Sequence, residues 1–381
     1  MPDVSQQPGK PKVLLLGKLP PPYMGPSVAT QILLSSSLKD RVVLHHVNTN
    51  VHETMDTLGT WNTDKVWANL NIYRQFVRSI RATSPDIVVV PISQTTLGFV
   101  KDSIFLIASR LFRIPVLVQL RGSNLQNWLA SAPSPVRWYV TKVLRSSHGA
   151  IVLGERLRYL FHGLVPEDRI FVVPNGANYL LPESRNGRAS RPPHVNVLCL
   201  TNLQEAKGIY DVIEGVHLAL RHGTKNFHLD MVGAWDNPET ERRCKGYVAK
   251  HRLPVTFHPP AVGDEKFRLL AGADVFIFTP RQPEGHPWVI VEALAAGLPI
   301  ISTDRGAIAD CVLDGHNGFI VDGAHPEQIE QKLSLLVSDV KLRDRFGRAS
   351  RQLYLEKFTE EKMVERMHHA ICKVLNGHLQ G

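Results

Sequence analysis

The sequence lacks an apolar run long enough to cross a membrane. The longest candidate, residues 103–120, is interrupted by Arg110 and Arg113, whereas a spanning helix needs about 20 consecutive apolar residues. No secretory signal opens the chain, because residues 1–12 are polar and rich in proline. We therefore expect a flexible leader over residues 1–12 and a cytoplasmic protein, with peripheral contact to the inner face of a membrane as the alternative to a freely diffusing one.

Cysteine is scarce, and neither cysteine nor histidine is spaced as in a metal site. The four cysteines are isolated from one another, at Cys199, Cys244, Cys311 and Cys372. We expect reduced packing residues, no metal site and metal-independent chemistry. The dinucleotide fingerprint G-x-G-x-x-G is also absent, which counts against an NAD enzyme.

Acidic residues are scarce in the first half of the chain. Residues 1–190 carry 21 Lys and Arg against 11 Asp and Glu, whereas the remainder carries 23 against 24. This asymmetry favours an anionic partner for the first half, such as a membrane surface, a lipid phosphate or an acidic acceptor. Three basic-aromatic patches, at 74–81, 137–145 and 156–161, would suit helices lying on an anionic membrane. Solvated surface charge on ordinary amphipathic helices is the alternative, and no nucleic-acid partner is expected.

Short apolar runs alternate with helical segments throughout the chain. Six strand-like runs occupy the first half, at 12–17, 42–47, 85–90, 114–120, 150–153 and 170–173. Six more occupy the second half, at 195–200, 227–232, 255–258, 275–278, 299–302 and 318–321. This alternation predicts two doubly wound α/β domains with parallel sheets. We place the first domain at 13–181, a linker at 182–194, the second domain at 195–359 and a terminal helix at 360–381.

The most informative stretch is EGHPWVIVEALAAGLPI, residues 284–300. Two carboxylates, Glu284 and Glu292, stand eight positions apart around a predicted helix start, and Gly297 suits a left-handed helix end. A helix start favours anions, so a carboxylate beside it needs another ligand, for which sugar hydroxyls are the obvious candidate. For either glutamate alone, a solvated or packing role is the alternative.

This stretch resembles the E-x7-E signature of family 4 glycosyltransferases, which are retaining enzymes of the GT-B fold. The resemblance implies two Rossmann-like domains facing a cleft, a UDP- or GDP-sugar donor, and a terminal helix that crosses back to the first domain. It implies that Glu292 holds the ribose hydroxyls. It also implies that the sugar is held by a group of five residues, Glu284, Gly285, His286, Pro287 and Trp288.

A second motif, LQEAKGIYDVIEGV at 203–216, resembles the GRL-x3-KG segment of the same family. Lys207 would place an ammonium beside a helix start, where both attract a diphosphate. Asn202 stands where the family has Arg and offers a neutral hydrogen bond instead. Gly233 would let the donor approach a strand end closely, and Arg281 would add positive charge. A solvated loop lysine is the alternative for Lys207.

In the first half, the loop 21–30 resembles the family's Gly-Gly loop. Gly25 and Ser27 remain candidate donors to the diphosphate, whereas Pro26 has no N–H. Arg121 stands where many members have His. Because Arg stays protonated it cannot act as a base, but it can hold a donor phosphate or an anionic acceptor. An Arg paired with a neighbouring acid is the alternative.

The sequence therefore predicts a retaining glycosyltransferase with Glu284, Lys207 and Arg121 as its catalytic residues. The acceptor would be a hydroxyl of a glycan or lipid-linked glycan, in the synthesis of cell-surface polysaccharides or glycoconjugates. The departing phosphate oxygen could take the acceptor proton, so no protein base is required. The alternatives are a non-catalytic GT-B scaffold or nucleotide-sugar-binding subunit, and a nucleotide-sugar epimerase.

Overall fold

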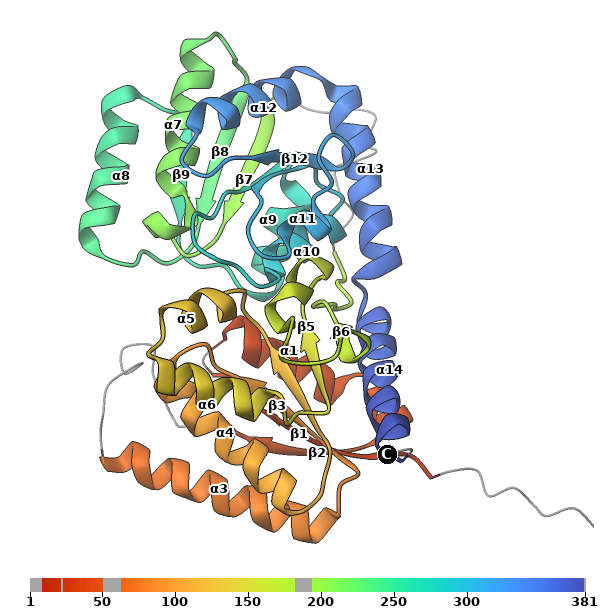
Figure 1. Cartoon of the computed structure of the whole chain (residues 1–381). Helices are drawn as coiled ribbons and strands as arrows, with labels where there is room; N and C mark the ends of the chain where they lie inside the picture. Colours follow the sequence, from red (N-terminus) through yellow and green to blue (C-terminus); the bar gives the residue numbers. More distant parts are fainter. Residues whose placement is uncertain (1–8, 22, 51–62, 182–193, 380–381) are drawn as a thin grey trace, which may run out of the picture. The chain divides into compact units, whose positions relative to one another are not determined.

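The computed structural model describes residues 9–21, 23–50, 63–181 and 194–379 (Figure 1). Residues 1–8 of the predicted leader and 182–193 of the predicted linker lie outside this description. The chain divides into two compact units, Met1–Pro174 with Glu360–Gly381, and Asn175–Thr359. Residues 175–181, which we assigned to the first domain, thus group with the second unit. There the backbone N–H of Ala177 donates to the Phe358 carbonyl at 3.2 Å.

Unit 1 contains a six-stranded parallel sheet in the order β2-β1-β3-β4-β5-β6. Its strands are β1 (Lys12–Gly17), β2 (Val43–Asn48), β3 (Ile87–Ile92), β4 (Val116–Leu120), β5 (Gly149–Val152) and β6 (Ile170–Val172). The central strands are mostly apolar, with Gln119 of β4 as a buried polar residue, because helices cover both faces of a parallel sheet.

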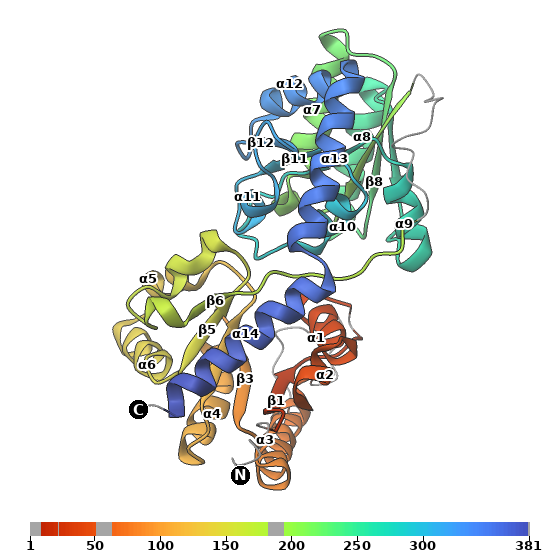
Figure 2. The same cartoon turned by 90° about the vertical axis from the view of Figure 1, so that its right-hand side faces the viewer.

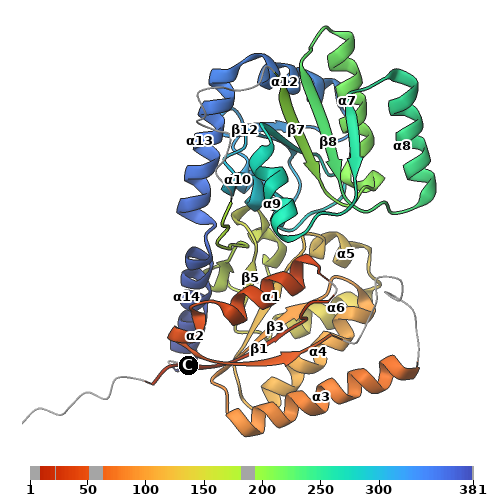
Figure 3. The same cartoon turned by 180° about the vertical axis from the view of Figure 1, so that it is seen from behind.

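The helices of unit 1 form one layer on each face of this sheet. They are α1 (Gly25–Ser35), α2 (Leu38–Arg41), α3 (Thr63–Thr83), α4 (Thr96–Leu111), α5 (Leu125–Ser131) and α6 (Ser134–Leu144), with the short 3-10 helices η2 (Glu155–Phe161) and η3 (Glu167–Arg169). Right-handed crossovers place α3, α4 and α6 on one face and α1 on the other, as the opposite views of Figures 1 and 3 show.

The terminal helix α14 (Glu360–Leu379) packs on unit 1 (Figure 2). Its apolar side chains enter one core with those of β1, β3 and α1, and they are Met363, Val364, Met367, Ala370, Ile371 and Val374. The helix therefore completes the core of a unit whose other elements end 186 positions earlier, at Pro174.

Unit 2 repeats the doubly wound plan with the strand order β12-β11-β10-β7-β8-β9. Its strands are β7 (Val195–Leu200), β8 (Phe227–Val232), β9 (Val255–His258), β10 (Val275–Phe278), β11 (Ile300–Thr303) and β12 (Gly318–Val321). Its helices are η4 (Glu205–Lys207), α7 (Ile209–Arg221), α8 (Pro238–His251), α9 (Gly263–Gly272), α10 (Trp288–Ala295), α11 (Ile308–Cys311), α12 (Pro326–Ser338) and α13 (Val340–Lys357). Both predicted sets of six strands are confirmed, with ends displaced by one or two residues.

Two segments of unit 1 differ from the sequence-based expectation. Residues 156–161, considered for a helix on a membrane, lie in the 3-10 helix η2, where Leu157, Leu160 and Phe161 are buried. Most of the apolar side chains of this patch therefore pack in the core, whereas Tyr159 stays exposed. Helix α5 was not predicted, since seven residues give too short a periodic pattern. Over the described residues, none of the helices combines the length and hydropathy of a membrane span.

Candidate functional site

Two loops of unit 2 are joined by backbone contacts next to the predicted motifs. The amides of Arg281 and Gln282 donate to the Ala206 carbonyl at 2.9 and 3.2 Å. Gly208 adopts φ +75°, and a Cβ at this position would collide with the Thr279 carbonyl. The left-handed glycine thus lets the loop before α7 approach the loop after β10. These contacts hold the two loops side by side.

The joined loops bring Lys207 against Glu284. The Lys207 ammonium forms an ion pair with Glu284 Oε1, and Gln282 Nε2 donates to the same oxygen at 3.1 Å. Both charged side chains are mostly buried, at 15% and 13% exposure. A charge pair in that position is screened less than a surface pair, so Glu284 holds the ammonium in a fixed place.

Glu292 lies inside α10 and is almost fully buried, with 5% of its side chain exposed. Its Oε1 pairs with the ammonium of Lys266 from α9 at 2.5 Å. Within the described part of the chain, its Oε2 has no hydrogen-bond partner. Burial and the nearby Glu292 carboxylate raise the pKa of Tyr179 well above its usual value. An unsatisfied buried carboxylate oxygen is costly and is a ready acceptor for a ligand hydroxyl.

The turn between the two glutamates is fixed by its backbone. The Ala307 amide donates to the Gly285 carbonyl at 2.9 Å, and the Asn175 side chain donates to the His286 carbonyl at 2.7 Å. The His286 imidazole is buried, with its Nε2 3.1 Å from Cys311 Sγ and its ring on Phe358. The structure thus places this imidazole in the core of unit 2, where packing occupies it.

The helix start itself is close to the expectation. Pro287 is the N-cap residue of α10, and Trp288 is the first helical residue, half-buried. Gly297 has φ +67° and ends the helix in the predicted left-handed conformation. Glu284 therefore lies on the loop before the helix and Glu292 within it, as the sequence indicated.

The remaining predicted residues of unit 2 take different roles. Asn202 is exposed, and Gly233 packs so tightly that a Cβ would meet the Thr201 carbonyl. Arg281, expected to add free positive charge, forms a two-point ion pair with the buried Asp211, whose hydrogen bonds raise the pKa of Arg281. This pair neutralises most of the charge that Arg281 would add.

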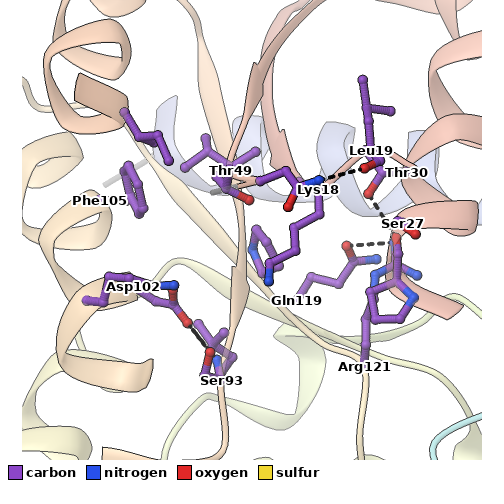
Figure 4. A pocket seen from close by; sticks show the side chains of 18 of the residues that line it. Lys18, Leu19, Ser27, Thr30, Thr49, Ser93, Asp102, Phe105, Gln119 and Arg121 are labelled. Atoms are coloured by element: carbon purple, nitrogen blue, oxygen red, sulfur yellow. Dashed lines mark hydrogen bonds between the residues drawn. The ribbon is translucent and has the colours of Figure 1, made fainter. Parts of the chain in front are cut away.

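Unit 1 contains a pocket of about 230 Å³ at the carboxyl ends of β1 to β4 (Figure 4). This is the edge at which doubly wound sheets bind ligands. Three cations line the pocket, Lys18 after β1, Lys101 on α4 and Arg121 after β4, together with one carboxylate, Asp102. The described residues that line the pocket therefore carry a net positive charge.

Hydrogen bonds orient the charged groups of this pocket. Asp102 Oδ2 accepts from the Ser93 amide at 2.8 Å and from the Ser93 hydroxyl at 2.6 Å. Burial raises the pKa of Asp102, which the Ser93 hydrogen bonds and Lys101 oppose. Burial lowers the pKa of Arg121 to about 10, so its guanidinium stays charged at neutral pH, and it donates to Gln119 Oε1 at 3.1 Å.

The predicted residues of unit 1 lie at or beside this pocket. Arg121 and Ser27 line it, and the Ser27 hydroxyl also donates to the Met24 carbonyl at 2.9 Å. Gly25 is the first residue of α1. The sequence analysis missed Lys18 and Asp102 here and Lys266 in unit 2. Lys18 had a signal, because it directly follows a predicted strand, whereas the other two depend on helix packing.

The described residues contain no group of three or more His, Cys, Asp or Glu side chains that could hold a metal ion. The charged groups available to a ligand are lysine, arginine and carboxylate side chains. Unit 2 thus offers an ammonium beside a helix start and a buried hydroxyl acceptor, and unit 1 offers a cationic pocket.

Comparison with known proteins finds relatives of this chain. Residues 182–353, somewhat under half of the chain, match the family model of the group 1 glycosyl transferases. Most of unit 2 therefore matches the group 1 glycosyl transferase family. A D-inositol 3-phosphate glycosyltransferase of Paenarthrobacter aurescens (strain TC1) is 29% identical over 191 residues, 48% of this chain and 46% of that protein. The match thus spans about half the length of this curated relative.

Solved glycosyltransferase structures resemble the whole chain in fold. A glycosyltransferase from Rickettsia africae ESF-5 has a TM-score of 0.74 at 17% identity, covering 96% of this chain and 99% of that chain. Anabaena Alr3699/HepE, solved with UDP, has a TM-score of 0.70 at 15% identity, covering 95% and 100%. The predicted fold class, GT-B with two Rossmann-like parallel-sheet domains, is confirmed.

The ion pair of Lys207 with Glu284 is testable by charge removal. We expect Lys207→Ala to lower turnover with a nucleotide-sugar donor by about 100-fold or more, since one charge-stabilising donor is commonly worth that much. Lys245→Ala removes the lysine of the exposed Lys245–Glu241 pair in α8 and is the matched control. Steady-state rates measure both, and equal rates for Lys207→Ala and wild type would contradict the assignment.

The contact of Gly208 with Thr279 predicts a specific sensitivity to a methyl group. Gly208→Ala combines left-handed strain with a clash, so we expect it to lower the free energy of unfolding by about 2–4 kcal/mol. Gly315 has a similar φ, +71°, but open space around the position of a Cβ. Gly315→Ala should cost only the strain, about 1 kcal/mol. Urea unfolding measures the free energy of unfolding of both variants. Equal losses in the two variants would mean that the contact of Gly208 with Thr279 adds nothing to the cost of a left-handed alanine.

Proposed function

We propose that this chain is a retaining glycosyltransferase that moves a sugar from a nucleoside-diphosphate sugar to an acceptor hydroxyl. One observation carries the proposal: buried Glu292 keeps one oxygen without a partner in the described chain, on the helix whose preceding loop carries the Glu284–Lys207 pair. A hydroxyl donor satisfies that oxygen, and a diphosphate suits the ammonium. Both belong to a nucleotide sugar.

The donor would be distributed over three charged groups of unit 2. Glu292 Oε2 accepts from a ribose hydroxyl, while Lys266 on Oε1 keeps the carboxylate oriented. Lys207 neutralises the diphosphate as negative charge grows on it, in a position that Glu284 has fixed in advance. Glu284 keeps a second oxygen for a sugar hydroxyl. We favour a uridine donor, because the fold neighbour Alr3699/HepE was solved with UDP.

The reaction would proceed without a protein base and without a metal. The bond from the sugar to the diphosphate breaks as the acceptor oxygen forms its bond on the same face, and the leaving phosphate oxygen takes the acceptor proton. Lys207 supplies the positive charge that this leaving group needs. Arg121 stays protonated and thus has an electrostatic role, holding an anion and not removing a proton.

The acceptor would bind in the pocket of unit 1 and carry an anionic group. Lys18, Lys101 and Arg121 give the pocket its positive charge, and its volume of about 230 Å³ admits a group the size of one sugar ring or phosphate. The related enzyme from Paenarthrobacter aurescens acts, by its name, on a phosphorylated polyol. A phosphate-bearing glycan or lipid-linked glycan of a cell-surface polysaccharide fits the same chemistry.

Four unpaired thiols and a nucleotide-sugar donor fit a cytoplasmic enzyme.

Nucleotide binding provides a test that does not require the acceptor. We expect UDP to raise the melting temperature of the protein, because a ligand of the native state stabilises it. Glu292→Gln keeps the shape but replaces the carboxylate by a neutral and weaker acceptor for the ribose hydroxyl, so UDP affinity should fall by about tenfold. Glu330→Gln, at another buried glutamate of unit 2, is the control. Stabilisation by ADP or GDP alone would reject the uridine donor, and no effect of any nucleotide would reject the donor site.

The anionic acceptor is tested by kinetics on the pocket of unit 1. Lys18→Ala should raise the KM for a phosphate-bearing polyol acceptor by about tenfold, the effect of one charged hydrogen bond. The UDP-induced melting shift should stay unchanged, because Lys18 belongs to unit 1. A neutral acceptor used as well as its phosphorylated form would overturn the anionic class. UDP binding without any transfer or donor hydrolysis would point to a binding subunit.

A further inference from the structure

Helix α4 exposes a stripe of aliphatic side chains on its outer side. Five residues at spacings of three or four form one exposed stripe, and their exposures are 64% for Leu97, 45% for Val100, 41% for Ile104, 43% for Ile107 and 80% for Leu111. The buried side combines polar and apolar residues, namely Phe99, Asp102, Ser103, Phe105, Leu106 and Ser109. A surface helix normally turns polar side chains to solvent, and a contiguous exposed apolar patch marks an interaction site.

The neighbouring helices α3 and α6 also carry exposed apolar side chains. Helix α4 contacts α3 and α6, the three lie on one face of the sheet in Figure 1, and Ser103 Oγ lies 2.7 Å from Tyr139 Oη of α6. Helix α3 adds Leu70 and Trp67, and α6 adds Trp138, whose ring is 63% exposed. We call these eight residues, Trp67, Leu70, Leu97, Val100, Ile104, Ile107, Leu111 and Trp138, the α4 face.

Cations surround the α4 face almost without acids. Arg110, Arg113, Lys142 and Arg145 line one hollow at the ends of α4 and α6, and the described residues lining it include no Asp or Glu. Residues 67–83 of α3 add Arg74, Arg78 and Arg81, all exposed. Over these residues of α3 and all of α4 and α6, the one acidic side chain is Asp102, which is buried. Much of the positive excess of the first half is thus concentrated here.

We propose that the α4 face docks on an anionic lipid bilayer. The aliphatic stripe and the two tryptophans would enter the boundary between headgroups and acyl chains, and the flanking Arg and Lys would contact lipid phosphates. Charge complementarity favours this occupant, because an apolar face flanked by cations, with no exposed acid in residues 67–83 of α3 or in α4 and α6, matches an anionic surface.

Docking would also bring the acceptor pocket to the lipid surface. Lys101 and Asp102 line that pocket from α4, the same helix that carries the stripe. On the proposed function, the acceptor would then be lipid-linked, with its phosphate drawn from the headgroup layer into the pocket. This consequence rests on the proposed transferase activity, whereas docking itself does not.

Vesicle flotation tests the docking. Full-length protein is mixed with vesicles of phosphatidylcholine alone, or of phosphatidylcholine and phosphatidylglycerol in equal parts. We expect binding to the anionic vesicles, weakened by high salt. Ile104→Gln, Ile107→Gln and Leu111→Gln combined should reduce partitioning by about tenfold or more, since three apolar groups lose their contact with lipid.

A matched control separates the face from general hydrophobicity. Leu335, Val340 and Leu355 of unit 2 are similarly exposed, at 47%, 46% and 51%, and their triple Gln variant should bind vesicles as the wild type does. Arg110→Gln with Lys142→Gln should weaken binding by roughly fivefold per cation. All variants change exposed positions, and an unchanged melting temperature with UDP shows that the fold and the donor site are intact.

Three results would overturn the docking. They are no binding to anionic vesicles, equal loss in the unit 2 control, or equal binding to neutral vesicles. A dimer in light scattering that the α4 triple variant dissociates would instead assign the face to a second copy of the chain. Failure of the UDP shift with intact vesicle binding would reject the proposed function and leave the docking standing.

Discussion

The contact between Gly208 and the Thr279 carbonyl determines the geometry of unit 2. It requires a left-handed residue without a side chain, and the Ala206 carbonyl then accepts amides from Arg281 and Gln282. Two loops 77 positions apart thereby bring Lys207 to Glu284. Without this close approach, the ammonium and the carboxylate would belong to separate, solvated loops. The charge arrangement of the site is therefore a consequence of backbone packing.

Glu284 and Glu292 are stabilised in the same way. Each is mostly buried and each pairs with one lysine, Glu284 with Lys207 and Glu292 with Lys266. Burying charged groups costs several kcal/mol each unless partners compensate, and here the compensation of Glu292 stops at one oxygen. A ligand hydroxyl that donates to Glu292 Oε2 would form the hydrogen bond that the folded chain leaves unmade. Strong local charge and incomplete pairing make this part of unit 2 suitable for binding.

Unit 1 has the same kind of doubly wound sheet, but one of its surface helices, α4, exposes apolar side chains. Helix α4 carries Asp102 and Lys101 toward the cationic pocket and an aliphatic stripe toward solvent. The exposed stripe contributes little hydrophobic stabilisation to the isolated unit, because its side chains stay in contact with water. A second surface that covers the stripe would gain that burial.

The sequence by itself determined the local structure, including the helix start between Glu284 and Glu292. Short runs rich in apolar residues predicted the twelve parallel strands, and Pro287 and Gly297 marked the ends of the helix that carries Glu292. These features depend on neighbours within a few residues, which periodicity and turn chemistry describe well. The resemblance of 284–300 to a glycosyltransferase signature followed from the same local pattern.

Only the tertiary structure decided which charges pair and which faces stay exposed. Lys266 reaches Glu292 across 26 positions, Arg281 reaches Asp211 across 70, and His286 turns into the core. In α4, apolar residues occur on both sides, so the sequence period does not say which side is buried. The crossover connections and the helix packing determine which side of α4 is buried, because long-range contacts depend on where the sheet topology places each segment.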